Sequence, residues 1–458
     1  MGGGAWSKSK SLSLVRLIGF LCILSSPLWV YGLFFPFPSD YWIKNDAAAF
    51  FLVLVLLVAI QAFLIRAVAA RDHFTAEVMM VGFLLKLAAV SAYMFTSVRI
   101  YEGVGDVFFY FFSGSAIADK LSLTGEWTFL RPFWSTNFII MLTSWLVVVF
   151  GPCFQALMII FAAVSYWGQY LFYRSFCIAF PKQQHQVAGL FMFFLPSLVY
   201  WTATIGKDAV IFFFIGGCCY GFAKMVHTNR AGGLVLLLTS LGGVMLIRPH
   251  VAGMLAIPLC IAYLYSKNRR GTMGMAVKIC VIPLLLFANA YLIVQMRNFV
   301  IKDSRQLPNV LEETQSVLQR AGEVNLQVPG STFGNSLSYR LIAAPFLLFR
   351  PFPWEVRNPQ MAVAAVESLA LMAFVWRRRK LTRPSFKKCR ENAFLLFAWL
   401  YFWEFSFLLA GAMTNFGLLA RQRDMLIPLA MMIFLSQPLP SSGRVTMRYA
   451  KGLAWATH

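Results

Sequence analysis

An acidic and a basic residue stand side by side between two apolar runs in the middle of the chain. Residues 196–209 read PSLVYWTATIGKDA, and Lys207 and Asp208 are followed at once by the run AVIFFFIGG. Ionisable side chains so close to hydrocarbon are costly and tend to be kept for function. An interfacial salt pair that caps two helix ends is the competing structural interpretation. This segment alone does not decide between the two.

Several other polar residues lie at the ends of apolar runs. They are Gly105, Asp106 and Tyr110, then Arg248, Pro249 and His250, then Arg340, residues 350–357, and residues 415–424 with Arg421 and Arg423. A single arginine at a helix end often only extends its charged group to the interface. Planar guanidinium groups can also bind phosphate oxygens in pairs, and a nearby carboxylate can accept the proton of an attacking sugar hydroxyl. Together these residue types suit transfer of a sugar from a lipid-linked phosphate.

The composition indicates an integral membrane protein. Of the 458 residues, 59% are hydrophobic, 16% aromatic and only 13% charged, and the mean hydropathy is +0.68. Soluble domains carry about 25% charged residues. The formal charge of +22 does not indicate nucleic acid, because the basic residues lie mostly in short loops between apolar runs. The eight cysteines show neither paired metal-ligand spacing nor a disulfide framework.

Apolar runs long enough to cross a bilayer recur along the chain. The sequence predicts an all-α bundle of about twelve transmembrane helices near residues 14–35, 47–68, 77–98, 153–175, 187–205, 209–224, 232–248, 251–266, 277–295, 360–376, 393–413 and 424–437. A further run, 137–150, ends at Gly151 and Pro152 and is interpreted as a re-entrant or interfacial helix. Counting it as a span would invert every later loop.

The charge distribution supports this topology. With the N-terminus inside, the cytoplasmic segments hold most of the 40 basic residues and few of the 18 acidic ones, as the positive-inside rule expects. We therefore expect both termini in the cytoplasm, and nearly every polar cluster on the outer face of the cytoplasmic membrane.

The chain is predicted to form a single integral membrane domain, 1–458, with two long outer segments. The first, 99–152, contains an amphipathic helix from about Val107 to Ala118 and the re-entrant run. The second, 296–359, contains a predicted helix, VLEETQSVLQRAGEV, and then the aromatic segment RLIAAPFLLFRPFPWEVR. No repeat of fixed period is evident.

Five short motifs resemble those of bacterial multi-spanning proteins from polysaccharide gene clusters. They are GDVFFY at 105–110, FLPSLVYWTATIGKDA at 194–209, RPH at 248–250, FRPFPWE at 349–355 and NFGLLARQRD at 415–424. The resemblance covers residues 100–435 and is to GT-C glycosyltransferases and EpsG- or Wzy-type polymerases. It implies a GT-C-like architecture and a role in exopolysaccharide assembly, as a polymerase or as a single-sugar transferase.

The resemblance also implies site residues. GT-C enzymes place an essential acid in the first large outer loop, where Asp106 stands, with Asp40 of the preceding outer loop as the competitor. The acidic pair of many GT-C enzymes is absent around Asp106, so the use of a divalent metal stays open. Related polymerases and ligases are thought to rely on arginines instead, which suits Arg248, Arg421 and Arg423.

These arguments together give one set of candidate site residues. The catalytic candidates are Asp106 and Asp208, and the phosphate- or substrate-binding candidates are Lys207, Arg248, His250, Arg350, Arg421, Arg423 and Tyr110. The expected partners are a polyprenyl-linked sugar donor, a glycan or lipid-linked acceptor, membrane lipid and other polysaccharide-assembly proteins, but no nucleic acid. The pattern predicts no definite cofactor, and a divalent metal stays open.

A transporter or flippase for lipid-linked oligosaccharide is the alternative. Transporters usually show two related halves and ionisable residues near the membrane midplane. Only Lys86, Glu367 and Glu404 fall well within predicted spans. If these three lined a water path, transport would be favoured. Otherwise we expect them to make hydrogen bonds between helices.

Overall fold

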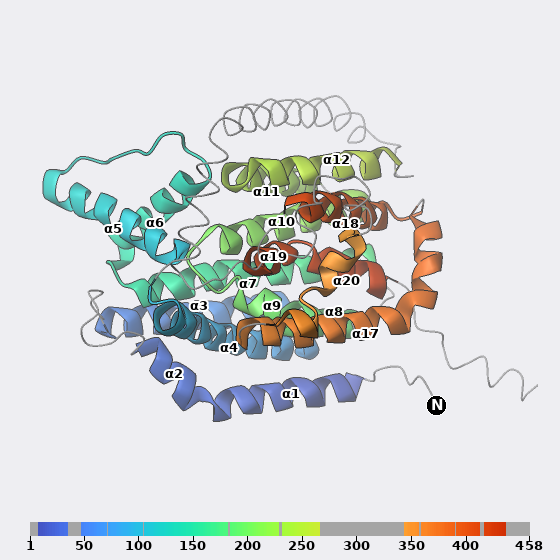
Figure 1. The fold of residues 1–458 in the computed structure, drawn as a ribbon, viewed down its shortest axis with the longest axis horizontal. Helices are drawn as coiled ribbons and strands as arrows, with labels where there is room; N and C mark the ends of the chain where they lie inside the picture. Colours follow the sequence, from blue (N-terminus) through green and yellow to red (C-terminus); the bar gives the residue numbers. More distant parts are fainter. Residues whose placement is uncertain are drawn as a thin grey trace, which may run out of the picture.

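The computed structural model describes ten stretches of the chain. They are residues 8–34, 47–70, 72–103, 105–181, 184–228, 231–265, 343–356, 359–389, 391–412 and 416–436. These residues form helices joined by turns, without a strand among them. Figure 1 shows many of the long helices running in roughly parallel or antiparallel directions through the molecule. The protein is a helical membrane protein, as its composition predicts.

Six of the described helices are long and apolar enough to cross a membrane. The spans are Ala48–Ala69, His73–Ile100, Phe154–Ala179, Lys207–His227, Gln360–Arg379 and Ala393–Ala410. They belong to α3 (Ala47–Ala69), α4 (His73–Phe95) with η1 (Thr96–Ile100), α7 (Phe154–Ala179), α10 (Lys207–His227), α17 (Pro359–Lys388) and α18 (Ala393–Ala412). The pair α1 (Lys8–Leu24) and α2 (Ser26–Phe34), bent by 53°, can count as a seventh.

The remaining predicted spans are shorter or broken. Run 187–205 is divided at Leu195 into α8 (His185–Phe194) and α9 (Pro196–Tyr200). The runs 232–248 and 251–266 correspond to α11 (Ala231–Ile247) and α12 (Pro249–Tyr265), of 17 residues each, and 424–437 to α20 (Ile427–Leu435). Other short elements are η4 (Ala344–Phe349), η5 (Pro353–Glu355) and α19 (Phe416–Arg423). The predicted span 277–295 and most of outer segment 296–359 lie outside the described residues.

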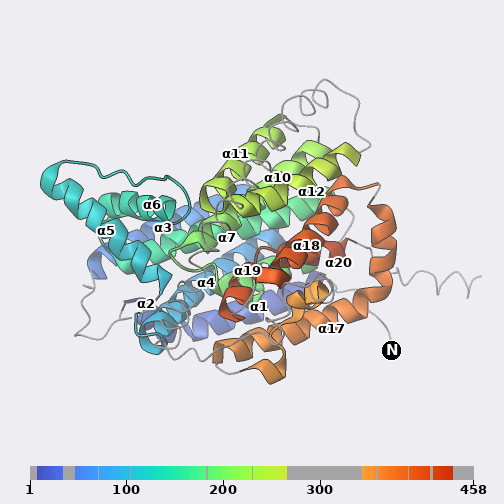
Figure 2. The ribbon, with the colours of Figure 1, turned by 45° about the horizontal axis from the view of Figure 1, so that its top comes forward.

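Helix α10 packs closely against both α7 and α11 (Figure 2). Glycines permit this close approach. A Cβ on Gly216 would lie 2.7 Å from the carbonyl oxygen of Gly168 in α7, and one on Gly221 would lie 2.8 Å from that of Gly233 in α11. Small residues at helix contacts are typical of membrane bundles. The contacts fix the axis of α10, and so the position of Lys207 and Asp208 in its first turn.

Between α9 and α10, residues 201–206 leave the helical conformation. Carbonyls released by such a break need donors, because hydrocarbon supplies none. Lys86 of α4, fully buried, donates to the carbonyl oxygens of Leu198 and Val199 at 3.3 and 3.0 Å and to Thr202 Oγ1 at 2.5 Å. Lys86 therefore makes hydrogen bonds between helices, which is the role expected of an intramembrane ionisable residue that does not line a water path.

The first predicted outer segment folds as a helical hairpin that lies at one edge of the molecule (Figure 1). Its arms are α5 (Asp106–Thr124) and α6 (Thr136–Phe150), which pack on each other. Helix α5 contains the predicted amphipathic helix but extends beyond it, to a left-handed cap at Gly125 with φ 70°. Helix α6 has 15 residues, which is short for a crossing of about 20 residues.

Candidate functional site

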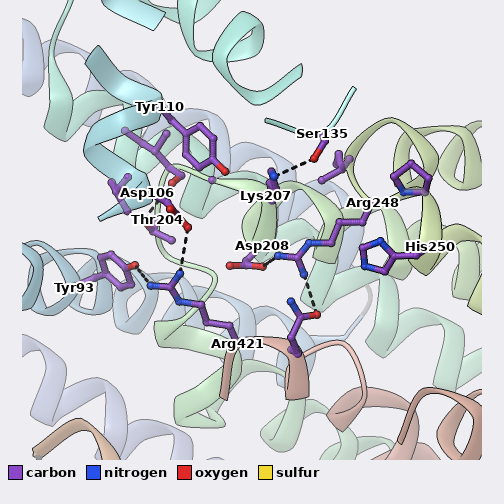
Figure 3. A pocket seen from close by; sticks show the side chains of 16 residues that line it. Tyr93, Asp106, Tyr110, Ser135, Thr204, Lys207, Asp208, Arg248, His250 and Arg421 are labelled. Atoms are coloured by element: carbon purple, nitrogen blue, oxygen red, sulfur yellow. Dashed lines mark hydrogen bonds and ion pairs between the residues drawn. The ribbon is translucent and has the colours of Figure 1, made fainter. Parts of the chain in front are cut away.

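A cavity of about 240 Å³ lies where the ends of several helices meet (Figure 3). Its lining comes from segments far apart in the sequence: Tyr93, Asp106, Val107, Tyr110, Ser135, Thr204, Ile205, Gly206, Lys207, Asp208, Ile247, Arg248, Pro249, His250, Arg421 and Gln422. We call this cavity the pocket. Seven of the nine candidate site residues line it, and Arg350 and Arg423 do not.

Four helices begin at the pocket. Asp106 and Lys207 are the first residues of α5 and α10, Ser135 is the N-cap of α6, and Pro249 opens α12. The N-caps of α5, α6 and α10 make no side-chain hydrogen bond to the helix. The first turns of a helix carry unpaired N–H groups and a partial positive charge that attract anions. Their convergence makes the pocket favourable for a negatively charged ligand.

Lys207 is held by hydroxyl groups. Its Nζ donates to Ser135 Oγ at 3.0 Å (Figure 3) and also to Thr136 Oγ1 at 2.8 Å. Among the described residues no carboxylate lies within ion-pair distance of this ammonium. Neutral hydroxyl groups fix its position but leave its charge available to a ligand.

Arg248 joins two walls of the pocket. It follows the last residue of α11, and its guanidinium donates to Asp208 Oδ1 at 2.7 Å and to Gln422 Oε1 at 3.0 Å. The Arg248–Asp208 pair is mostly enclosed, with exposed side-chain fractions of 13% and 15%. Charge-assisted hydrogen bonds of this kind are strong and directional, so Asp208 orients Arg248 rather than standing free as a base.

Asp106 and Arg421 form a looser pair at the mouth of the pocket. The closest atoms, Arg421 Nη1 and Asp106 Oδ2, are 3.7 Å apart, and the side chains are 33% and 73% exposed. Arg421 also contacts Tyr93 Oη at 3.5 Å and lies over the ring of Trp201 at 5.6 Å. Asp106 is thus the carboxylate that an incoming hydroxyl can reach.

Two neutral rings complete the lining. Burial, with Asp106 and Asp208 nearby, raises the pKa of Tyr110 well above its usual 10, so the phenol keeps its proton and can donate a hydrogen bond. The surrounding protein, with Arg248 and Lys207, lowers the pKa of His250 below its usual 6.5. Because His250 is still exposed to water, we expect its pKa to be lowered less than that of a fully buried histidine. At neutral pH the ring is uncharged.

The two remaining candidates lie elsewhere. Arg350 pairs with Glu355, and its carbonyl accepts from Arg423. Arg423 is fully buried and pairs with Glu367 of α17 at 2.9 Å. Neither can contact a ligand in the pocket as the side chains stand. Asp40, the competitor of Asp106, lies outside the described residues.

Sequence reasoning did not single out five polar residues of the site. Tyr93, Ser135, Thr204 and Gln422 line the pocket, and Thr136 contacts Lys207. Ser135, Thr136 and Asn137 form a polar triplet directly before the apolar run of α6, and such residues are typical of helix starts. That signal could have placed the start of α6 beside the other helix starts. Nothing in the local sequence distinguishes Tyr93.

Within the described part of the chain, no three His, Cys, Asp or Glu side chains group closely enough to hold a metal ion. Comparisons of the chain with family models, with curated proteins and with solved structures gave no match.

Proposed function

We propose that this protein is a membrane glycosyltransferase that takes its sugar from a polyprenyl phosphate or diphosphate. The observation that carries the proposal is the convergence of four helix starts and three cations, Lys207, Arg248 and Arg421, on one small cavity. Phosphate is the ligand that such an arrangement binds best. A GT-C-like architecture with about twelve spans and a role in exopolysaccharide assembly are part of the same proposal.

The side chains have distinct roles in this reaction. Lys207, Arg248 and Arg421, with the helix starts around them, hold the donor phosphate and stabilise the charge that develops on it as the glycosidic bond breaks. Asp106, exposed beside Arg421, accepts the proton of the acceptor hydroxyl. A phosphate leaving group stabilised by positive charge needs no general acid, so one accessible carboxylate is enough.

Basic residues support an outer-face location for the pocket. Arg174, Lys224 and Arg377 to Arg379 lie toward the C-terminal ends of α7, α10 and α17. At the other ends, Lys207 of α10 lines the pocket and Phe154 of α7 stacks on Phe108 of α5. Gln360 of α17 donates to Tyr200, whose ring packs on Tyr93 of the pocket. By the positive-inside rule, ends rich in Lys and Arg are cytoplasmic. The pocket would then open at the periplasmic or extracellular face of the cytoplasmic membrane, where lipid-linked sugars and glycan acceptors meet.

The experiment that tests the proposal is sugar transfer from polyprenyl phosphate and polyprenyl diphosphate donors in proteoliposomes. We expect Lys207→Met to lower the transfer rate on the order of 100-fold or more. Lys224→Met is the matched control, because Lys224 lies in the last turn of the same helix, away from the pocket. We expect it to transfer within about twofold of wild type. Equal loss in both variants would contradict the proposal. A wild type that moves lipid-linked sugar across the bilayer without transferring it would favour the flippase.

A further inference from the structure

A second acid–arginine pair lies buried near the pocket. Arg423 and Glu367 are exposed by 0% and 2% and approach to 2.9 Å. The Glu367 carboxylate also accepts the backbone N–H of Ser197 at 2.6 Å and its hydroxyl at 2.5 Å. Replacing a buried ion pair by apolar residues is often neutral or stabilising. The stability of the fold alone therefore does not account for this pair.

The pair joins segments that are distant in the sequence. Arg423 donates to the carbonyl oxygen of Arg350 at 2.6 Å, to Ser368 Oγ at 2.7 Å and to Ser197 Oγ at 2.9 Å. Through these bonds α17 holds both α9 and α19, with the segment after η4 between them.

Both of the elements held by this pair lead into the pocket. Helix α19 carries Arg421, two residues before Arg423, and Gln422, which follows it, accepts from Arg248. Helix α9 continues through residues 201–206 to Lys207 and Asp208. One wall of the pocket thus follows α19, and the facing wall follows α9.

Helix α9 cannot hold its own position. It has five residues, and a helix in a protein owes most of its stability to tertiary contacts rather than to its own hydrogen bonds. Side chains from three other helices bond to its backbone. Glu367 of α17 accepts the N–H of Ser197 in its first turn. Lys86 of α4 donates to the carbonyls of Leu198 and Val199, and Gln169 of α7 donates to that of Leu198 at 3.3 Å. The place of α9, and of the segment that follows it, is therefore set by these contacts.

We propose that Glu367 is a positioning residue of the transfer reaction, which fixes Arg421 relative to Lys207 and Asp208 by tying α19 to α9. This inference rests on the proposed function of the pocket. Glu367 does not line the pocket, so it acts only through the side chains that it places.

A double-mutant cycle tests this role. We expect Glu367→Gln to lower kcat at least tenfold, with KM for the donor changed less, and Glu367→Asp to recover part of the loss. If Glu367 acts by placing Arg421, the double variant Glu367→Gln with Arg421→Ala transfers within about twofold of Arg421→Ala alone, because coupled residues are not additive. Losses that multiply would overturn the proposal.

Two further variants keep the test decisive. Glu404→Gln is the matched control, because it makes the same change in α18, outside the pocket, and we expect a transfer rate within twofold of wild type. If Glu367→Gln does not fold, Ser197→Ala removes the two bonds that the Ser197 hydroxyl makes with Glu367 and Arg423. The backbone N–H of residue 197 still donates to Glu367. We expect Ser197→Ala to lower kcat at least threefold, again without adding to Arg421→Ala. No loss in Ser197→Ala would overturn the proposal.

Binding separates failure of this inference from failure of the proposed function. If wild type binds polyprenyl phosphate but transfers no sugar, the proposed function is wrong, and the same cycle is measured on the dissociation constant of polyprenyl phosphate. We then expect Glu367→Gln and Arg421→Ala each to weaken binding at least fivefold, and the double variant to bind like Arg421→Ala. Multiplied losses in binding would again overturn the positioning role.

Discussion

Two acid–arginine pairs share helix α19 but lie in opposite environments. Arg421 meets Asp106 at 3.7 Å where both can contact water, whereas Arg423 meets Glu367 at 2.9 Å with almost no exposure. The two arginines are two positions apart and point to different surroundings because a helix turns about 100° per residue. In the proposed reaction, an arginine paired with an acid serves the ligand in one region, and the same kind of pair serves the geometry of the fold in the other.

The two pairs should also differ sharply in how much they contribute to the free energy of unfolding. An exposed ion pair contributes about 0–1 kcal/mol to stability. Removing one partner of a buried pair costs about 3–5 kcal/mol, because the other charge is left without compensation. The predictions below sharpen or break this contrast, from the largest expected effect to the smallest.

The largest expected effect is on the transfer rate of Arg421→Ala, a variant that should lose activity but keep its stability. We expect the transfer rate to fall on the order of 100- to 1,000-fold, because a cation at a developing charge is removed. The free energy of unfolding in detergent should fall by less than about 1 kcal/mol. A variant that is mainly unstable would show that Arg421 serves the fold as Arg423 does.

Loss of stability is the corresponding test of the buried pair. We expect Glu367→Ala to lower the free energy of unfolding by about 3–5 kcal/mol, measured as reversible unfolding in mild detergent. Glu404→Ala is the control, with an expected loss below about 1 kcal/mol. Equal losses in the two variants would show that the buried pair with Arg423 contributes nothing to stability beyond what any acid in these apolar helices contributes.

The two carboxylates of the pocket should also differ in stability. Asp208 accepts a charge-assisted bond from enclosed Arg248, so Asp208→Asn should cost roughly 1–2 kcal/mol. Asp106→Asn should cost less than about 0.5 kcal/mol, because its pair is long and exposed. Thermal unfolding of both variants in the same detergent gives the comparison. A reversed order would contradict the assignment of Asp208 to orientation and of Asp106 to the accessible mouth.

The smallest expected effect concerns His250 and pH. Its pKa is lowered in the folded protein, so below pH 6.5 the unfolded chain binds a proton that the folded chain does not, and stability falls as pH falls. His250→Gln should lose less stability between pH 7.5 and pH 5 than wild type, by no more than about 2 °C in Tm. An identical pH dependence in the two proteins would show that His250 titrates normally.

The sequence predicted the helical membrane class and seven of the sixteen residues that line the pocket, because both depend on short-range signals. Long apolar runs identify membrane helices, and polar residues at the ends of those runs must lie near a boundary. Asp106, Lys207 and Arg248 each stand at the end of an apolar run, and the structure brings those ends together.

Other features depend on packing that a sequence does not display. Run 187–205 reads as one span, but the chain breaks at Leu195, where Pro196 begins a new short helix. Arg421 and Arg423 look equivalent in NFGLLARQRD, and only the packing of α19 against η4 and α17 separates them. Ser135 and Thr136 lie about 70 residues from Lys207, so their contact with it is a property of the tertiary fold.

The most direct test of the account is sugar transfer by Asp106→Asn in proteoliposomes supplied with labelled polyprenyl-phosphate sugar and an acceptor glycan. The account predicts a folded variant that binds the donor like wild type but transfers on the order of 100-fold more slowly, since the amide cannot accept the proton of the acceptor hydroxyl. Transfer by Asp106→Asn at the wild-type rate would contradict the assignment of this pocket as the site of glycosyl transfer.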